Sequence, residues 1–191
     1  MVQELQALDR NLPADRAVGN LSSPIAIAVG ANLAGPFGSP LAACQQAVRM
    51  IAALPFLRPA GVSTWYDTEP VPRSMQPNFV NGVALFVTRE APVDPAKLLK
   101  ALNEIETQGG RRRFEPNAAR TLDLDIVIMG DLIRAAPDPV LPHPRAHLRR
   151  FVLEPLRDVL PQWRHPVLGR TVEELLAGLP PDGTRRLADG R

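Results

Sequence analysis

Four short segments of the chain have the apolar patterns and residue types that are typical of β-strands. Residues 25–30 alternate isoleucine or valine with alanine, which predicts a first strand with small side chains on one face. Val62–Tyr66 and Phe79–Val87 are rich in β-branched and aromatic residues and predict a second and a third strand. In Leu122–Met129 every second residue from Leu122 to Ile128 is apolar, which predicts a fourth strand buried on that face.

Two segments between these strands carry the signals that begin and end an α-helix. Each starts with a capping residue followed by proline, at Ser39-Pro40 and at Asp94-Pro95, and continues with apolar residues at helical spacing. The first helix is expected to stop before Pro55 and the second at Gly109-Gly110. A further helix is predicted near residues 148–158.

The predicted elements follow the order strand, helix, strand, strand, helix, strand. This order is that of the α+β ferredoxin-like βαββαβ sandwich, an antiparallel sheet with both helices on one face and the other face open. After Gly130 a C-terminal helical extension is expected, and its last helix begins where Thr171 and Glu174 form a capping box. Residues 1–23 lack a clean period and predict a flexible N-terminal arm, with residues 24–191 as a single domain.

Composition narrows the possible functions. The 191 residues, 45% hydrophobic and 22% charged, are near the average for one globular domain. A net charge of +2 is not that of a nucleic-acid-binding protein. The single cysteine, Cys44, excludes an internal disulfide or a multi-cysteine zinc site, and no apolar stretch is long enough to cross a membrane. We therefore expect a cytoplasmic protein without membrane or nucleic-acid partners.

The most informative chemistry is the segment from Arg120 to Asp125, which carries Asp123 and Asp125 two residues apart on a predicted strand. Both carboxylates then point to the face opposite the leucines. Two adjacent carboxylates repel each other unless a cation stabilises both charges. Without a neighbouring His, Cys or Glu cluster, the pair favours Mg²⁺, which takes its remaining ligands from water and substrate phosphates. Solvated aspartates on an exposed strand face are the alternative.

Arginines next to this pair favour a phosphate-binding site. Arg111, Arg113 and Arg120 flank the aspartates, and guanidinium groups bind phosphate oxygens in pairs of hydrogen bonds. A solvated run of charges is the alternative for residues 111–113. His143 lies between two prolines that restrict its backbone, so it is interpreted either as a phosphate contact or as a turn residue.

A long proline-rich loop, residues 67–78, separates the second and third predicted strands, and loops of this length are usually functional or mobile. Phe79 and Asn81 follow it on one strand face, where a ring stacks on a flat heterocycle and an amide binds its edge. The alternatives are that Phe79 is a core residue and that Asn81-Gly82 forms a β-bulge.

These motifs together resemble the 6-hydroxymethyl-7,8-dihydropterin pyrophosphokinase family of folate synthesis, over about residues 25–161. The resemblance rests on the following segments in order: Gly30-Ala31-Asn32-Leu33, Thr68-x-Pro70, Gln76 to Asn81, Glu106 leading to Gly110-Arg111-x-Arg113, Arg120 to Asp125, and Pro142-His143-Pro144. It implies a ferredoxin-like fold that transfers pyrophosphate from ATP to the pterin hydroxyl and releases AMP. The arginine and paired-aspartate segment is the most specific of these motifs.

The resemblance also implies roles for individual residues. Asp123 and Asp125 would bind two Mg²⁺ ions and act in catalysis with Arg111 and Arg120. The residues implied to contact the triphosphate of ATP are Arg111, Arg113, Arg120, His143 and Arg149. The residues implied to hold the pterin are Phe79, Asn81 and Phe151, with backbone groups near Thr68 and Val71. The chain is expected to act as a monomer, with segments 67–78 and 111–120 closing over the substrates.

One segment departs from the family pattern, and two rival functions remain open. Asn117-Ala118-Ala119 replaces the family's aromatic-Gly-Pro run, so no aromatic lid residue is expected there. No Ser or Cys has a base partner that would make it a nucleophile. An RNA-binding module is disfavoured because only 5% of the residues are aromatic. Another metal-dependent phosphoryl or nucleotidyl transferase would keep the aspartate pair and lose the pterin contacts.

Overall fold

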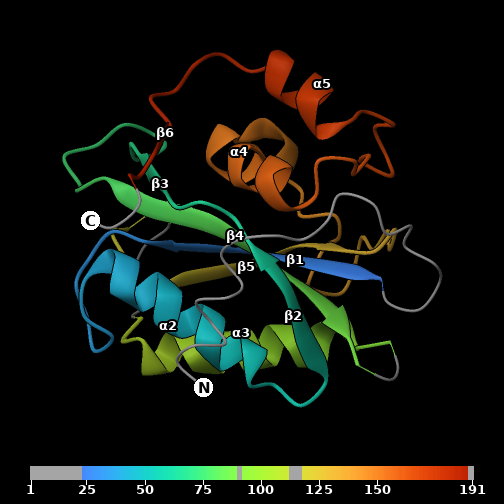
Figure 1. Cartoon of the computed structure of the whole chain (residues 1–191), viewed down its shortest axis with the longest axis horizontal. Helices are drawn as coiled ribbons and strands as arrows, with labels where there is room; N and C mark the ends of the chain where they lie inside the picture. The colour runs from blue at the N-terminus through green and yellow to red at the C-terminus, as the bar shows by residue number, and fades with distance from the viewer. Residues whose placement is uncertain (1–22, 90–91, 112–117, 189–191) are drawn as a thin grey trace.

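The computed structural model describes residues 23–89, 92–111 and 118–188 (Figure 1). The predicted N-terminal arm therefore lies outside the described residues, apart from Ser23. The described chain is a mixed α/β structure around one antiparallel sheet, as the sequence predicts. Its strands are β1 (Pro24–Ala31), β2 (Leu57–Val62), β3 (Tyr66–Thr68), β4 (Phe79–Thr88), β5 (Asp123–Met129) and β6 (Arg185–Arg186). Its α-helices are α2 (Pro40–Ala52), α3 (Pro95–Gln108), α4 (Arg150–Val159) and α5 (Val172–Ala177).

Both predicted helix starts of the N-terminal half are confirmed. Ser39 caps α2 by accepting a hydrogen bond from the Ala42 N–H, and Asp94 caps α3 by accepting one from the Ala96 N–H. In each helix proline occupies the first turn, where its missing N–H costs nothing. The capping box predicted for the last helix is also present, because Thr171 and Glu174 each bond the other's backbone N–H.

The prediction of a second strand at Val62–Tyr66 is wrong about where the strand lies. Two strands flank that segment instead, β2 before it and β3 after it, and both pair with β4. The register of β2 shifts between Pro59 and Gly61, because a strand proline cannot donate a ladder hydrogen bond. Between the two strands the Ser63 hydroxyl accepts a hydrogen bond from the Val83 N–H at 2.9 Å.

The prediction that side chains of Leu122–Met129 alternate strictly between the two faces of the sheet is wrong from Val127 onward. Leu124 and Ile126 face one core cluster, whereas Val127 and Ile128 both belong to the cluster on the other face. The cause is a register irregularity against β1, where Ile27 pairs with Ile126 and Ala26 with Ile128. An extra residue in one strand reverses the side-chain alternation beyond it.

The sheet order is β5-β1-β4-β3-β6, with β2 also on β4. Helices α2 and α3 cover one face and α4 with α5 the other, so the second face is not open as predicted (Figure 1). One buried cluster lies between the sheet and α2 and α3. The second joins the sheet to α4 and α5 through Val152, Leu153, Leu156, Val172, Leu175 and Leu176. Only part of the second face is left for a binding site.

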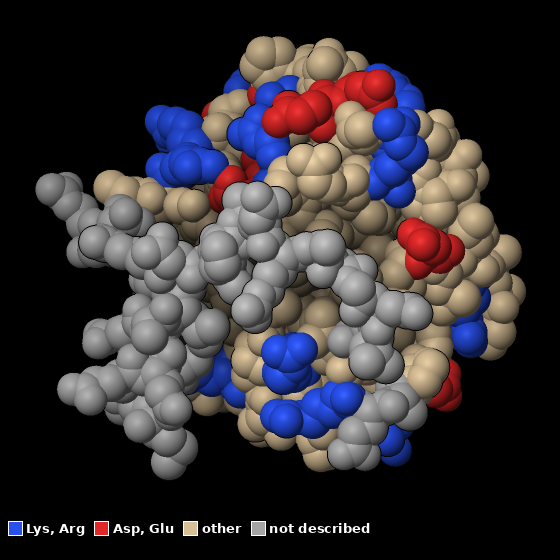
Figure 2. All heavy atoms as spheres, turned by 45° about the vertical axis from the view of Figure 1, so that its right-hand side comes forward, with Lys and Arg blue, Asp and Glu red and all other residues tan. Residues whose placement is uncertain are grey.

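The surface carries charges of both signs. Figure 2 shows lysine and arginine side chains interspersed with aspartate and glutamate over the face that it presents. Within the described part of the chain, no helix is both long enough and apolar enough to cross a bilayer.

Candidate active site

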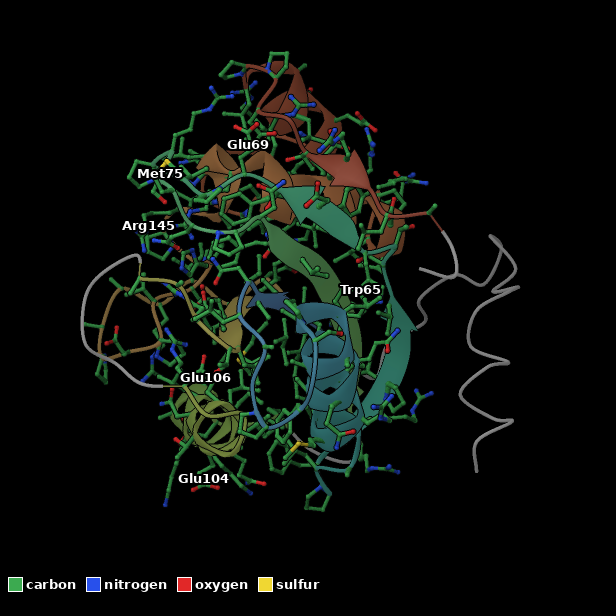
Figure 3. All side chains as sticks on the ribbon, turned by 90° about the vertical axis from the view of Figure 1, so that its left-hand side faces the viewer. Trp65, Glu69, Met75, Glu104, Glu106 and Arg145 are labelled. Atoms are coloured by element: carbon green, nitrogen blue, oxygen red, sulfur yellow. The ribbon has the colours of Figure 1, made fainter. Side chains whose placement is uncertain are left out.

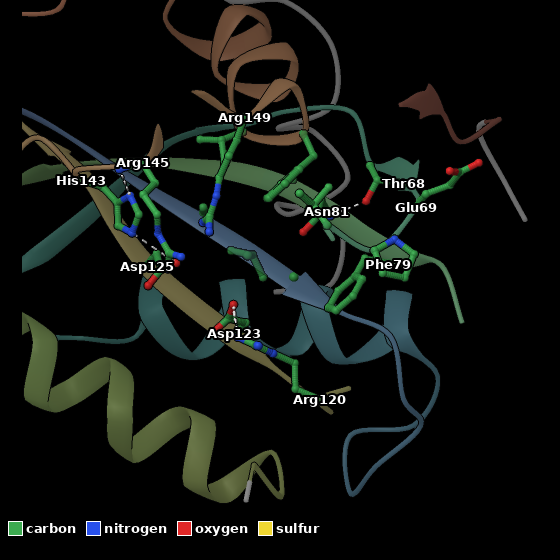
Figure 4. A pocket seen from close by; sticks show the side chains of 18 of the residues that line it. Thr68, Glu69, Phe79, Asn81, Arg120, Asp123, Asp125, His143, Arg145 and Arg149 are labelled. Atoms are coloured by element: carbon green, nitrogen blue, oxygen red, sulfur yellow. Dashed lines mark hydrogen bonds and ion pairs between the residues drawn. The ribbon is translucent and has the colours of Figure 1, made fainter. Parts of the chain in front are cut away.

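A pocket of about 220 Å³ lies on the sheet face that α4 partly covers (Figure 4). Its walls come from β1, β4 and β5, from the segment that follows β3, and from the start of α4. The lining residues are Ala28, Val29, Gly30, Thr68, Glu69, Pro70, Val71, Pro72, Phe79, Asn81, Gly82, Arg111, Arg120, Asp123, Asp125, His143, Arg145, Arg149, Phe151 and Val152. The structure therefore brings together in one pocket every site residue expected from the sequence except Arg113, which lies outside the described residues.

The two aspartates line the pocket from one strand but have different surroundings. Asp123 forms ion pairs with two arginines: Arg120 Nη1 lies 2.8 Å from its Oδ2 and Arg111 Nη1 lies 2.6 Å from its Oδ1. Asp125 faces His143 instead, with Nε2 3.8 Å from its carboxylate, and keeps 44% of its side-chain surface exposed (Figure 4). The alternative that both are solvated surface residues does not hold for Asp123, whose charge is neutralised inside the pocket.

Burial sets the protonation behaviour of this group. Burial raises the pKa of Asp125 above its usual value, and the neighbouring charge of Asp123 raises it further. Burial likewise lowers the pKa of His143, although the Asp125 carboxylate opposes that shift. Burial, reinforced by the Arg145 charge, lowers the pKa of Arg149. A cation placed between the carboxylates would reverse the effect on Asp125, because it stabilises the anion.

Glu106 supports the pocket from behind. It is 2% exposed on α3, forms an ion pair with Arg111, and accepts a hydrogen bond from the Leu124 N–H at 2.7 Å. These contacts fix Arg111 toward Asp123 and also fix the start of β5. The sequence analysis named Glu106 as part of a family motif and gave it no role. Its position next to Ile105, on the apolar side of the helix, was the signal that it is buried.

The other end of the pocket is aromatic and amide-lined. Phe79 belongs to neither buried core cluster, so the core alternative for this residue is wrong. Asn81 donates from Nδ2 to the Thr68 hydroxyl at 2.7 Å. Gly30 makes room for this amide, because a Cβ at residue 30 would lie 2.4 Å from Asn81 Oδ1. Phe151 also lines the pocket and lies beside Arg149, whose guanidinium carbon is 5.4 Å from the ring centre.

Asn81-Gly82 is not a β-bulge. Both residues pair with β1 in unbroken register, Asn81 with Gly30 and Gly82 with Val29. The glycine is needed for another reason, since a Cβ there would lie 2.7 Å from the Trp65 ring. The alternative of a bulge is therefore wrong, and Gly82 permits a close approach.

Two charged lining residues were missed from the sequence. Arg145 lies between His143 and Arg149, and its backbone N–H donates to His143 Nδ1 at 3.2 Å. Glu69 follows Thr68 and pairs with Arg73 at 2.7 Å. Figure 3 shows both on the same side of the molecule as Met75. The basic character of the segment from His143 to Arg149 was a usable signal for Arg145.

Comparison with known proteins agrees with this geometry. The model of the 7,8-dihydro-6-hydroxymethylpterin-pyrophosphokinase (HPPK) family matches residues 26–161. The chain belongs to this family. A 2-amino-4-hydroxy-6-hydroxymethyldihydropteridine pyrophosphokinase of Pseudomonas aeruginosa is 42% identical over 161 residues, which cover 84% of this chain and 94% of that protein. A protein of the same name from Synechocystis sp. is 34% identical, over 75% of this chain and 72% of its own length.

Longer proteins share the same unit. The folic acid synthesis protein fol1 of Schizosaccharomyces pombe is 36% identical over 74% of this chain, which spans 19% of that protein. A crystal structure of Plasmodium falciparum HPPK-DHPS with pterin and p-hydroxybenzoate matches with a TM-score of 0.60 at 12% identity, over 84% of this chain and 44% of that one. At that identity the likeness shows the fold alone.

Proposed function

We propose that this pocket is the active site for the reaction of the family. The chain transfers pyrophosphate from ATP to the hydroxyl group of 6-hydroxymethyl-7,8-dihydropterin, a step of folate biosynthesis. The main observation that supports this assignment is that one end of the pocket is charged and the other is aromatic. Asp123 and Asp125 line the first with arginines, and Phe79 with Asn81 lines the second.

The charged end fits a magnesium site. Asp123 and Asp125 supply oxygen ligands from one strand, and among the described residues no group of three or more His, Cys, Asp or Glu side chains is placed to hold a metal. Such a site leaves positions for water and phosphate oxygens, which is the coordination that Mg²⁺ prefers. Two Mg²⁺ ions held by these carboxylates would neutralise the phosphate charge that develops during transfer. The number of ions is part of the proposal.

The triphosphate of ATP is proposed to contact Arg111, Arg120, His143 and Arg149, together with Arg113 from outside the described residues. Arg111 and Arg120 are held in place by Asp123 before any nucleotide binds. Both guanidinium groups would exchange this carboxylate for phosphate oxygens when Mg²⁺ and ATP bind, and would then neutralise charge in the transition state. His143 and Arg149 contact the same pocket from the segment before α4.

The pterin is proposed to lie between Phe79 and Phe151, with its polar edge on Asn81 and on backbone groups near Thr68 and Val71. The Thr68 hydroxyl orients the Asn81 amide, which can present both a donor and an acceptor to a heterocycle. An aromatic face on each side selects for a flat ring. This arrangement would direct the hydroxymethyl group toward the charged end.

Catalysis is proposed to rest on positioning and charge neutralisation. The pterin hydroxyl oxygen forms a bond to the β-phosphorus of ATP, and the bond from that phosphorus to the oxygen bridging the α-phosphate breaks in line. AMP leaves with this oxygen, and the hydroxyl proton passes to water. The residues orient the two substrates, and Arg111, Arg120 and Arg149 neutralise charge. No protein nucleophile takes part, and trapping a covalent phosphoenzyme would contradict this mechanism.

Product analysis tests the proposal. The protein is incubated with ATP, Mg²⁺ and hydroxymethyl-dihydropterin, and the nucleotide products are separated. AMP and the pterin diphosphate in equal amounts are expected. ADP would indicate a simple kinase, and released pyrophosphate a nucleotidyl transferase; either product in place of AMP would overturn the assignment.

We also propose a ferredoxin-like sandwich with a C-terminal helical extension. The strand order, with β1 between β4 and β5 and two helices on one face, supports the ferredoxin-like description, and α4 and α5 support the C-terminal helical extension. A flexible arm at residues 1–23, one domain over residues 24–191, a monomeric state, a cytoplasmic location and the lack of nucleic-acid partners are likewise proposed. Sedimentation of the purified protein and digestion of its N-terminal arm by protease test the first three.

A further inference from the structure

The chain continues beyond the segment that the family model matches, and the continuation folds back toward the pocket. The match ends at residue 161. Helix α5 then packs on α4, and Arg150 of α4 donates to the carbonyls of Leu176 and Leu179 at 2.9 and 3.1 Å. The chain next crosses to the far edge of the sheet and ends in β6 beside β3 (Figure 1). We call residues 181–188 the C-terminal strap.

The strap adds a strand to an otherwise open sheet edge. Arg185 pairs with Asp67 and Arg186 with Tyr66 in antiparallel register. The Leu187 N–H extends the contact by donating to the Trp65 carbonyl at 2.8 Å. β3 is only three residues long, and a strand so short gains much of its order from its neighbours on both sides.

A cluster of side chains around Arg186 fixes the strap to β3 and α4. Arg186 pairs with Asp158 of α4 at 2.5 Å and donates from Nε to the Tyr66 hydroxyl at 3.1 Å. The Tyr66 hydroxyl in turn donates to Asp158 at 2.9 Å, and the Thr64 N–H donates to the same carboxylate at 3.3 Å. The cluster of Arg186, Tyr66 and Asp158 therefore joins the strap, β3 and α4.

The strap also contacts the segment that forms the aromatic end of the pocket. Arg185 pairs with Asp67 at 3.0 Å, one residue before Thr68. Gly183 lies against Glu69, since a Cβ at residue 183 would be 3.5 Å from Glu69 Oε1. Thr68 holds the Asn81 amide, and both Thr68 and Glu69 line the pocket. The strap thus contacts the residues on each side of Thr68.

We propose that the C-terminal strap is a positioning element for the pterin end of the active site. Among the described residues, no hydrogen bond or ion pair joins the strap to the arginines, aspartates or His143 of the triphosphate end, so its effect should fall on one substrate. Holding Asp67 and Glu69 fixes Thr68, and Thr68 fixes the Asn81 amide that reads the edge of the heterocycle. This inference rests on the proposed assignment of Thr68 and Asn81 to the pterin. Arg186 acts through β3 and is a positioning residue.

Steady-state kinetics with each substrate varied in turn tests the proposal. Arg186→Ala is expected to raise KM for the pterin on the order of tenfold, with KM for ATP changed less than about twofold. Arg186→Lys keeps the charge beside Asp158 and should restore part of the loss. Arg58→Ala removes an exposed arginine from β2 on the same sheet and should leave both KM values unchanged.

Leu187→Pro provides a second variant should Arg186→Ala fail to fold. Proline removes the N–H that bonds the Trp65 carbonyl and keeps both arginines of the strap. The same selective rise in pterin KM is expected. Unchanged pterin KM in a folded variant, or equal rises for both substrates, would overturn the role of the strap. Failure of the wild-type protein to form AMP would instead overturn the proposed function, so the two failures are distinguishable.

Discussion

Asn32 Oδ1 accepts the backbone N–H of Arg120 at 2.7 Å. The same side chain donates from Nδ2 to the Pro77 carbonyl at 3.1 Å, and it is only 3% exposed. The segments that contain Pro77 and Arg120, more than forty residues apart in the sequence, are therefore both bonded to this one buried amide. One carries Arg120, which is proposed to bind phosphate, and the other leads into Phe79, so Asn32 joins the two ends of the pocket.

Asn32→Ala should weaken both stability and catalysis. It leaves the Arg120 N–H without its partner, which should lower the free energy of unfolding by about 1–3 kcal/mol. The displaced Arg120 should lower kcat/KM on the order of tenfold or more. Urea denaturation and initial-rate kinetics measure the two effects. Gln45→Ala, at an exposed amide of α2, should change stability by less than about 0.5 kcal/mol, and equal effects of both substitutions would contradict the coupling.

Glu106→Gln should destabilise the protein because Arg111 loses its buried partner. The glutamine can still accept the Leu124 N–H, and Asp123 still neutralises part of the arginine charge. We therefore expect a loss of at most about 3 kcal/mol in the free energy of unfolding. Glu104→Gln on the exposed side of the same helix is the matched control (Figure 3). A Glu106 variant as stable as this control would show that the buried pair contributes nothing.

Gly82→Ala should cost about 1–3 kcal/mol through overpacking. Its Cβ would lie 2.7 Å from the Trp65 ring and 3.2 Å from the Ser63 hydroxyl, so one of these groups has to shift. Gly61→Ala is the control, since the nearest atom to its Cβ is 3.9 Å away. Guanidinium denaturation of both variants measures the difference. Equal midpoints would mean that the glycine at position 82 is not required by the ring.

Stability should fall in mild acid through His165. Its Nδ1 accepts the N–H groups of Val167 and Leu168, both at 3.3 Å, and burial followed by the His147 charge lowers its pKa. The unfolded chain binds a proton at a pH near 6.5, so the folded state loses stability as the pH falls below about that value. His165→Asn does not titrate there and should flatten the dependence of unfolding free energy on pH between 7.5 and 5. An unchanged slope in the variant would assign the acid sensitivity to other groups.

The sequence predicted the helix starts and the residues that line the pocket better than the strands. Caps at Ser39 and Asp94 are local signals, and the pairing of Asp123 with Asp125 follows from the strand period alone. The predicted position of the second strand was wrong because Pro59 and Gly61 are unusual in a strand. The pairing of β2 with β4 depends on long-range contacts that the local sequence does not reveal. Covering of the second face by α4 and α5 also depends on tertiary packing. Glu106 was not assigned a role, because its function comes from contacts with β5 and Arg111 that no local pattern reveals.

The most direct test of the central claim is calorimetric titration with a nonhydrolysable ATP analogue, with and without Mg²⁺. The wild-type protein should bind the analogue much more tightly with Mg²⁺, and Asp125→Asn should lose that dependence while keeping the wild-type fold. Asp131→Asn, at an exposed position just after β5, should behave as wild type. Equal binding with and without Mg²⁺ in the wild-type protein, or unchanged dependence in Asp125→Asn, would contradict a magnesium site at the paired aspartates.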